Sequence, residues 1–132
     1  MIGLGSGFTL AGALAAGAGP TRVIELEPRV VEASRFFHAA GAQPLDDPRV
    51  TLTLGDARTH LAHARERYDV IISEPSNPWI GGLASLFSTE FFQLARSHLR
   101  AGGLMLQWLQ GYNLYSDDFR MIVNTFRSVF PS

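Results

Sequence analysis

The sequence predicts an α/β protein with a doubly wound, mostly parallel sheet and helices on both faces. Short apolar, β-branched runs, typical of buried strands, alternate with segments of helical periodicity, and the connections are short. A glycine-rich loop follows the first run, and a proline-rich loop follows a later one. A chain of 132 residues is long enough for a real core, so we expect a single domain over residues 1–132.

The N-terminal half begins with the tail of a strand that ends at Ile2, followed by the loop Gly3–Gly7. Further strands are expected over 22–26 and 50–54. Helices are expected over 8–18, 29–40 and 57–65. We expect Gly41 to cap the second helix and Asp56 the third.

The C-terminal half continues the alternation. Strands are expected over 69–73 and 104–109. They are separated by a helix for which Ser88 is the expected N-cap and which is broken by Ala101-Gly102-Gly103. A final helix is expected over 117–129. Its stripe of Phe119 and Phe126, like the pair Phe91-Phe92, is expected in the core.

Composition excludes several classes of function. Eleven basic and twelve acidic residues give a net charge of −1 without long runs, which argues against nucleic-acid or anionic-membrane binding. The absence of cysteine excludes disulfides and thiol chemistry. The uncharged start of the chain is too rich in glycine and alanine for a membrane span.

Both ends look truncated. Only Met1 and Ile2 precede the glycine loop, although the first strand of a doubly wound fold should lie at the sheet centre. The chain also stops directly after a predicted helix. We therefore expect a fragment of a longer protein.

The glycine loop is the first candidate ligand site. Gly3, Gly5 and Gly7 would let a ligand approach the backbone at the start of a helix. A dinucleotide fingerprint requires glycine or alanine where this chain has Phe8, which argues against NAD and for a ligand without a pyrophosphate. The alternative is a tight strand–helix turn without a ligand.

Acidic residues follow the next two predicted strands. Glu25 and Glu27 share one side of an extended segment, and Glu25 lies roughly 20 residues after the loop, where nucleotide sites place an acid for the ribose. Either acid could instead be a solvated strand end or a partner of the following helix dipole. Asp56 could accept from an adenine amino group or only cap its helix.

The proline loop presents a second group of polar side chains. Glu74, Ser76 and Asn77 follow a strand directly, between two X-Pro steps that hold the backbone extended. Ligands bind at such strand ends in open α/β sheets. Trp79 could fold over a ligand, and Gln107 is a polar residue in a buried run that needs a partner. The alternative is a turn with incidental polar residues.

The histidines give no comparable signal. His60 and His63 are three residues apart on a predicted helix, but no third metal ligand is evident, so we expect them on a solvent face and predict no metal site. His38 and His98 are also expected at the surface.

In their order along the chain, these motifs resemble spermidine synthase, a polyamine aminopropyltransferase with the Rossmann-like class I methyltransferase fold. The matching segments are Gly3–Gly7, Ile24–Glu27, Asp47–Val50, Gly55–Ala57, Tyr68–Ile72, Glu74–Pro78, Leu86-Phe87, Phe91 and Gln107. The form Glu-Pro-Ser-Asn-Pro-Trp especially resembles bacterial spermidine-synthase-like proteins that are often fused to a membrane segment.

The resemblance implies aminopropyl transfer in polyamine biosynthesis, with decarboxylated S-adenosylmethionine as co-substrate and no prosthetic group. The acceptor would be an amine such as putrescine, and Glu74 would be the catalytic base. The donor-binding residues it implies are Gly3, Gly5, Ser6, Gly7, Glu25, Asp56, Ala57 and Ser73. The amine-positioning residues it implies are Ser76, Asn77, Trp79 and Gln107, and Ser73 would contact the amine as well as the donor. It also implies a cytoplasmic protein that could form a homodimer, tethered to a membrane only through a segment outside this chain.

Two departures keep other functions open. Ser6 and Asn77 stand where the family has acids that neutralise the ammonium groups of the substrates. One alternative is a methyltransferase that uses S-adenosylmethionine itself, because a neutral Ser6 suits the carboxylate tail of that donor. The other is a nucleotide-binding module without catalysis.

Overall fold

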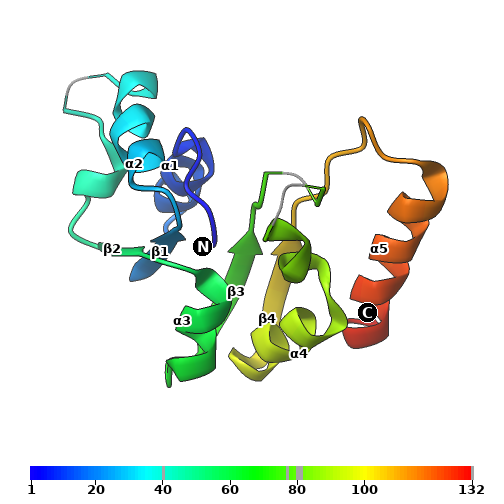
Figure 1. Cartoon of the computed structure of the whole chain (residues 1–132). Helices are drawn as coiled ribbons and strands as arrows, with labels where there is room; N and C mark the ends of the chain where they lie inside the picture. The colour runs from blue at the N-terminus through cyan, green and yellow to red at the C-terminus, as the bar shows by residue number, and fades with distance from the viewer. Residues whose placement is uncertain (40, 77, 80–81, 132) are drawn as a thin grey trace. The chain divides into compact units, whose positions relative to one another are not determined.

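The computed structural model describes residues 1–39, 41–76, 78–79 and 82–131. It contains two compact units, Met1–His60 and Leu61–Ser132, which are described separately (Figure 1). The described strands pair in parallel, as the sequence predicts. Among the described helices, none combines the length and the apolar character needed to cross a bilayer.

The strands of the first unit are β1 (Thr21–Glu25) and β2 (Val50–Leu54), which pair in parallel from Thr21↔Val50 to Glu25↔Leu54. Ile2 forms a parallel bridge to Ile24 on β1. The Gly3 amide donates to the Ile24 carbonyl at 2.9 Å. Strand β1 therefore lies between β2 and the short segment that leads into the glycine loop.

Helix α1 (Phe8–Ala15) is shorter than the predicted range 8–18. Its end is a Schellman motif: the Ala18 amide donates to the Ala13 carbonyl at 3.0 Å and the Gly17 amide to Leu14 at 3.1 Å. Gly17 has φ 90°, which a glycine adopts at little cost. The side chains that α1 buries, Leu10 and Leu14, pack with Leu4 and Val23 of β1 in the core of this unit.

Helix α2 (Pro28–Ser34) continues as a 3₁₀ turn, η1 (Arg35–Phe37), and ends before the predicted residue 40. The expected cap at Gly41 is therefore wrong. His38 is already extended, and the Gln43 side-chain amide donates to the Arg35 and His38 carbonyls at 3.1 and 3.2 Å. These bonds satisfy the carbonyls that a longer helix would have used.

A second 3₁₀ turn, η2 (Pro44–Asp46), leads to an ion pair at the start of β2. The Arg49 side chain donates twice to Asp47, at 2.9 and 2.7 Å, and once to the Ala18 carbonyl at 2.9 Å. The guanidinium, with the Arg49 amide, lowers the pKa of the Asp47 carboxyl to about 2. Arg49 thus joins the end of α1 to the segment before β2.

The strands of the second unit are β3 (Tyr68–Ser73) and β4 (Leu99–Gln107), which run side by side in the same direction (Figure 1). Strand β4 starts earlier than the predicted residue 104. Ala101-Gly102-Gly103 does not break the chain between helix and strand but forms an irregularity within β4, where Gly102 has φ 76° and the pairing register shifts. Beyond this point the register is regular, up to Ser73↔Gln107.

Strand β3 follows helix α3 (Ala57–His63), and a 3₁₀ segment, η3 (Leu83–Phe87), precedes α4 (Thr89–Ser97). The Ser88 side chain caps α4 by accepting from the Phe91 amide at 3.2 Å, as predicted. Phe91 and Phe92 are fully buried, which confirms the expectation for this pair. On the sheet, Ile71 is buried whereas Val70 is exposed, because neighbouring residues of a strand point to opposite faces.

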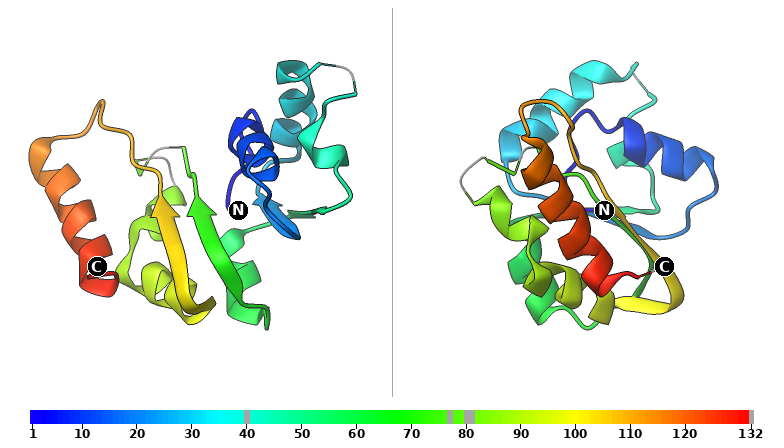
Figure 2. Two further views of the ribbon diagram at one scale, coloured as in Figure 1. Left: turned by 180° about the vertical axis from the view of Figure 1, so that it is seen from behind. Right: turned by 90° about the vertical axis from the view of Figure 1, so that its right-hand side faces the viewer.

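Helix α5 (Ser116–Val129) lies beside α4 in both Figure 1 and Figure 2. The Phe126 ring meets that of Phe92 edge-on, with centroids 5.1 Å apart. The expectation of a core position is wrong for Phe119, which is 41 % exposed. It lies in the first turn of α5, and the buried positions begin one turn later, at Ile122.

Candidate functional site

The glycine loop is a tight turn anchored on β1. The Gly7 amide donates to the Leu4 carbonyl at 2.9 Å, which closes the turn. The Leu4 amide donates to Glu25 Oε2 at 2.8 Å. Gly7 is buried with φ 81°, a conformation that side chains other than glycine rarely adopt. The structure thus brings the predicted loop residues together with Glu25.

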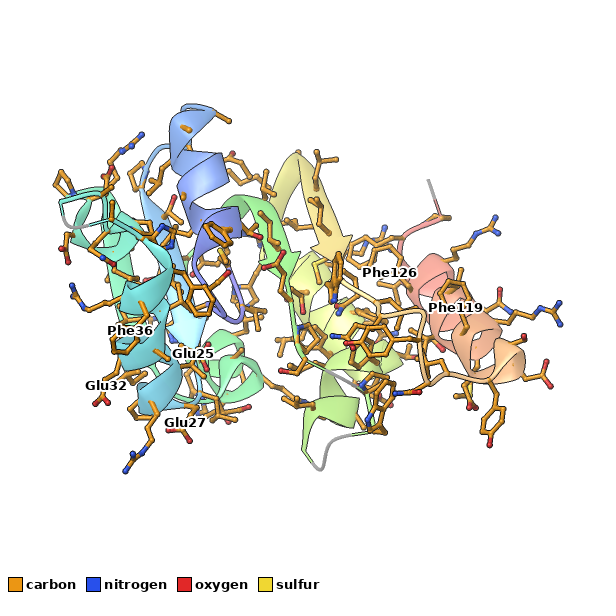
Figure 3. All side chains as sticks on the ribbon, turned by 90° about the horizontal axis from the view of Figure 1, so that it is seen from above. Glu25, Glu27, Glu32, Phe36, Phe119 and Phe126 are labelled. Atoms are coloured by element: carbon orange, nitrogen blue, oxygen red, sulfur yellow. The ribbon has the colours of Figure 1, made fainter. Side chains whose placement is uncertain are left out.

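Glu25 is only 7 % exposed and ends β1 directly beneath the loop. Its second oxygen, Oε1, accepts from the Glu27 amide at 2.9 Å. A carboxylate has about four acceptor positions, so two bonds leave capacity for a ligand hydroxyl. Glu27 lies close by (Figure 3), but its exposed side chain caps α2 by accepting from the Arg29 amide at 3.0 Å. Of the interpretations offered for Glu27, the structure therefore supports a contact with the start of the following helix.

Asp56 follows β2, at the same edge of the sheet as Glu25. The Gly55 amide donates to the Glu25 carbonyl at 2.9 Å, which connects the two strand ends. Asp56 Oδ1 accepts from the Thr59 amide at 2.7 Å, so the predicted cap of α3 is confirmed. Contact with an adenine amino group stays a prediction. Ala57, in the first turn of α3, is buried.

In the second unit, Ser73 and Gln107 are register partners at the carboxyl ends of β3 and β4. Ser73 is fully buried, and its carbonyl accepts from the Trp108 amide at 2.8 Å. In the described part of the chain, no partner reaches the buried Ser73 Oγ or Gln107 Oε1. Buried polar atoms are nearly always hydrogen-bonded, so these two oxygens indicate a missing partner, as expected for Gln107.

The proline loop follows directly. Glu74 is half-buried, Pro75 is buried, and Ser76 is exposed. Trp79 is 46 % exposed, and a closure of its ring over a ligand stays a prediction. Asn77 lies outside the described residues.

Sequence reasoning missed three polar side chains. His38, expected at the surface, is half-buried with Nε2 2.7 Å from the Ser6 carbonyl oxygen. His60, expected on a solvent face, has a buried Nε2 without a partner among the described residues, as does Oε1 of Gln110. Of these three residues, only Gln110 could have been found from the sequence, because it follows the candidate residue Gln107 closely and lies just beyond the end of a strand. Among the residues that the structure describes, no three or more side chains form a cluster that could hold a metal ion.

The arrangement in the first unit defines a class of protein. A glycine loop, an acid at the end of β1 and an acid after β2 all lie at the carboxyl ends of parallel strands, the edge at which Rossmann-like α/β folds bind nucleotides. Residues 18–132 match the family model described as the spermine/spermidine synthase domain. The chain belongs to this family.

Curated relatives include enzymes with two kinds of transfer in their names. A polyamine aminopropyltransferase of Korarchaeum cryptofilum is 29% identical over 131 residues, which cover 98% of this chain and 40% of the relative. Putrescine N-methyltransferase 2 of Nicotiana tabacum is 36% identical over 135 residues, covering 98% of this chain and 37% of the relative. The chain thus spans about two fifths of the length of these relatives.

Solved spermidine synthases share the fold. One, in complex with the transition-state analogue AdoDATO, gives a TM-score of 0.88 at 25% identity and covers 99% of this chain and 45% of its own. The spermidine synthase of Thermotoga maritima gives a TM-score of 0.83 at 25% identity, with coverages of 99% and 44%.

Proposed function

We propose that this chain is the catalytic domain of an aminopropyltransferase that transfers the aminopropyl group of decarboxylated S-adenosylmethionine to an amine such as putrescine. The observation that carries the proposal is the pair of buried, unpartnered oxygens of Ser73 and Gln107 beside Glu74, in a chain of the spermine/spermidine synthase family. Hydrogen-bond acceptors next to a carboxylate suit an ammonium group. From the family alone, we also propose a cytoplasmic location and a homodimeric full-length protein.

The donor site we propose lies in the first unit. Glu25 accepts from the ribose hydroxyls with the acceptor capacity left by its two backbone bonds. Gly3, Gly5, Ser6 and Gly7 let the nucleoside approach the backbone, and Asp56 with Ala57 borders the adenine. These roles are supported by the position of each residue at the carboxyl end of a parallel strand.

The chemistry we propose is a direct displacement. Glu74 takes a proton from the acceptor ammonium, and the freed lone pair attacks the aminopropyl carbon bonded to the sulfonium. The carbon–sulfur bond breaks, its electron pair stays on sulfur, and methylthioadenosine leaves. Ser73, Ser76, Asn77, Trp79 and Gln107 would align the amine, so that alignment and proton removal supply the rate enhancement.

The test is Glu74→Gln, with putrescine and decarboxylated S-adenosylmethionine as substrates. Loss of a general base lowers turnover by about 100-fold or more. Binding of methylthioadenosine, measured by calorimetry, should stay within about threefold, because Glu74 is assigned to the amine.

Glu32→Gln, which removes an exposed acid on α2, is the matched control and should leave turnover unchanged. Unchanged turnover in Glu74→Gln would show that Glu74 is not the catalytic base. A folded wild-type chain that binds no S-adenosyl compound would instead support a non-catalytic module.

A second candidate is N-methyl transfer from S-adenosylmethionine to the same kind of amine. It is favoured by the 36% identity to a putrescine N-methyltransferase and by the neutral Ser6 in the glycine loop. The attacked carbon would then be the methyl group, and S-adenosylhomocysteine would leave. Competitive titration with both donors separates the two reactions, because each predicts a preference for its own donor.

A further inference from the structure

We infer that His38 is a positioning residue for the donor: its imidazole holds the glycine loop in the shape that presents backbone amides to the nucleoside. This inference rests on the proposed function. It starts from the 2.7 Å contact between His38 Nε2 and the Ser6 carbonyl oxygen, which is partly shielded from solvent. A carbonyl only accepts, so Nε2 carries the hydrogen and donates it.

The contact is built into the local fold. Helix α2 ends early in η1, and His38 takes an extended conformation with φ −126° and ψ 144°. The Gln43 side chain donates to the His38 carbonyl at 3.2 Å and so fixes the backbone from which the ring extends. The Phe8 ring meets the imidazole edge-on, with centroids 5.1 Å apart.

The position of the His38 imidazole also depends on the glycine at position 7. A Cβ atom at Gly7 would lie 3.0 Å from His38 Nε2, closer than about nine in ten contacts of this kind, so the imidazole would have to move. The absence of a side chain at Gly7 is therefore what lets the imidazole reach the Ser6 carbonyl.

The hydrogen bonds that fix the loop leave two backbone amides between them for a ligand. Glu25 holds the Leu4 amide, the Leu4 carbonyl holds the Gly7 amide, and His38 holds the Ser6 carbonyl. Within the described residues, the amides of Gly5 and Ser6 donate to no protein acceptor. Two unused donors in an anchored turn are preorganised for a ligand, and preorganisation raises affinity.

The test is calorimetric titration of the 132-residue chain with methylthioadenosine. His38→Phe keeps a ring beside Phe8 but removes the donor, and it should weaken binding about tenfold. His38→Gln should stay within about threefold of wild type, because its amide nitrogen can occupy the position of Nε2. His38→Asn, whose amide reaches only the position of Nδ1, should resemble His38→Phe.

A second readout separates positioning from general stability. In ¹⁵N-labelled chain, methylthioadenosine should shift the amide resonances of Gly5 and Ser6 in wild type and His38→Gln, and shift them much less in His38→Asn. Phe36→Leu, which alters a side chain that is 90 % exposed and keeps the His38 donor, should bind like wild type. If His38→Phe and His38→Asn both bind as tightly as wild type, the inference is wrong and the proposed function stands. If folded wild-type chain binds neither methylthioadenosine nor decarboxylated S-adenosylmethionine, the proposed function itself fails.

Discussion

At the scale of single residues, Glu25 shows how one side chain can hold a loop in place and keep acceptor capacity for the ligand proposed above. Its two oxygens each accept a backbone hydrogen bond, one from Leu4 in the glycine loop and one from Glu27. Hydrogen bonds to a charged acceptor contribute more than neutral ones, and a buried donor left without its partner is costly. Glu25 should therefore matter to folding as well as to binding.

Glu25→Gln should lower the free energy of unfolding by about 1–3 kcal/mol. The substitution replaces one accepting oxygen by an NH₂ group, which would face a backbone N–H and leave it unsatisfied. Urea unfolding, followed by circular dichroism, measures the change.

Glu27→Gln is the control for this substitution. Glutamine can still accept from the Arg29 amide, and the position is exposed, so the loss should be well under about 1 kcal/mol. Equal losses at positions 25 and 27 would contradict the role assigned to Glu25.

At the scale of elements, the sequence sufficed where a local signal acts alone. The caps at Asp56 and Ser88 and the parallel strands were predicted from residue type and periodicity, and the structure confirms them. Helix α2 was predicted too long because its end depends on Gln43, a side chain outside the helical pattern. Strand β4 was predicted too short because Gly102 and Gly103 look like a breaker, whereas the pairing of Leu99 and Leu104 with β3 on either side keeps the two glycines within the strand.

The residues of the candidate site also differ in whether a local signal in the sequence predicts them. Glu25 could be predicted as a candidate ligand-binding acid from its distance after the glycine loop, and side-chain alternation places Glu27 on the same side. The contact of His38 with Ser6 could not, because it depends on where η1 ends and on the space above Gly7. No periodicity in the sequence encodes a long-range contact of this kind.

Asp56→Asn should separate the capping role of this residue from the adenine contact that we propose for it. Asparagine caps a helix about as well as aspartate, so the free energy of unfolding should change by less than about 0.5 kcal/mol. With its oxygen used by the Thr59 amide, asparagine would turn its NH₂ group toward the adenine amino group. Calorimetry should therefore show methylthioadenosine binding about tenfold weaker.

Asp56→Ala provides the comparison, because it removes the cap as well and should cost about 1 kcal/mol of stability. If Asp56→Asn binds methylthioadenosine like wild type, Asp56 is only a helix cap.

At the scale of the whole molecule, the charges nearly balance, with a net charge of −1. The dependence of stability on pH should therefore reflect specific pairs more than overall repulsion. The pair with the largest effect on a carboxyl pKa is Asp47–Arg49, which also joins the end of α1 to the segment before β2 through the Ala18 carbonyl.

Stability should fall as this pair is broken by acid. The pKa of Asp47 is about 2 in the folded chain against 3.8 for the free group, so its carboxylate stabilises the fold fully above about pH 4. The contribution is lost as the pH falls from about 4 through about 2, because the unfolded chain takes up the proton first. Between about pH 6 and about pH 2.5, the urea midpoint of wild type should decrease more than that of Asp47→Asn.

Asp46→Asn, which removes a single exposed contact with Arg35, should retain the wild-type decrease. Parallel curves for wild type and Asp47→Asn would show that the pair does not stabilise the fold.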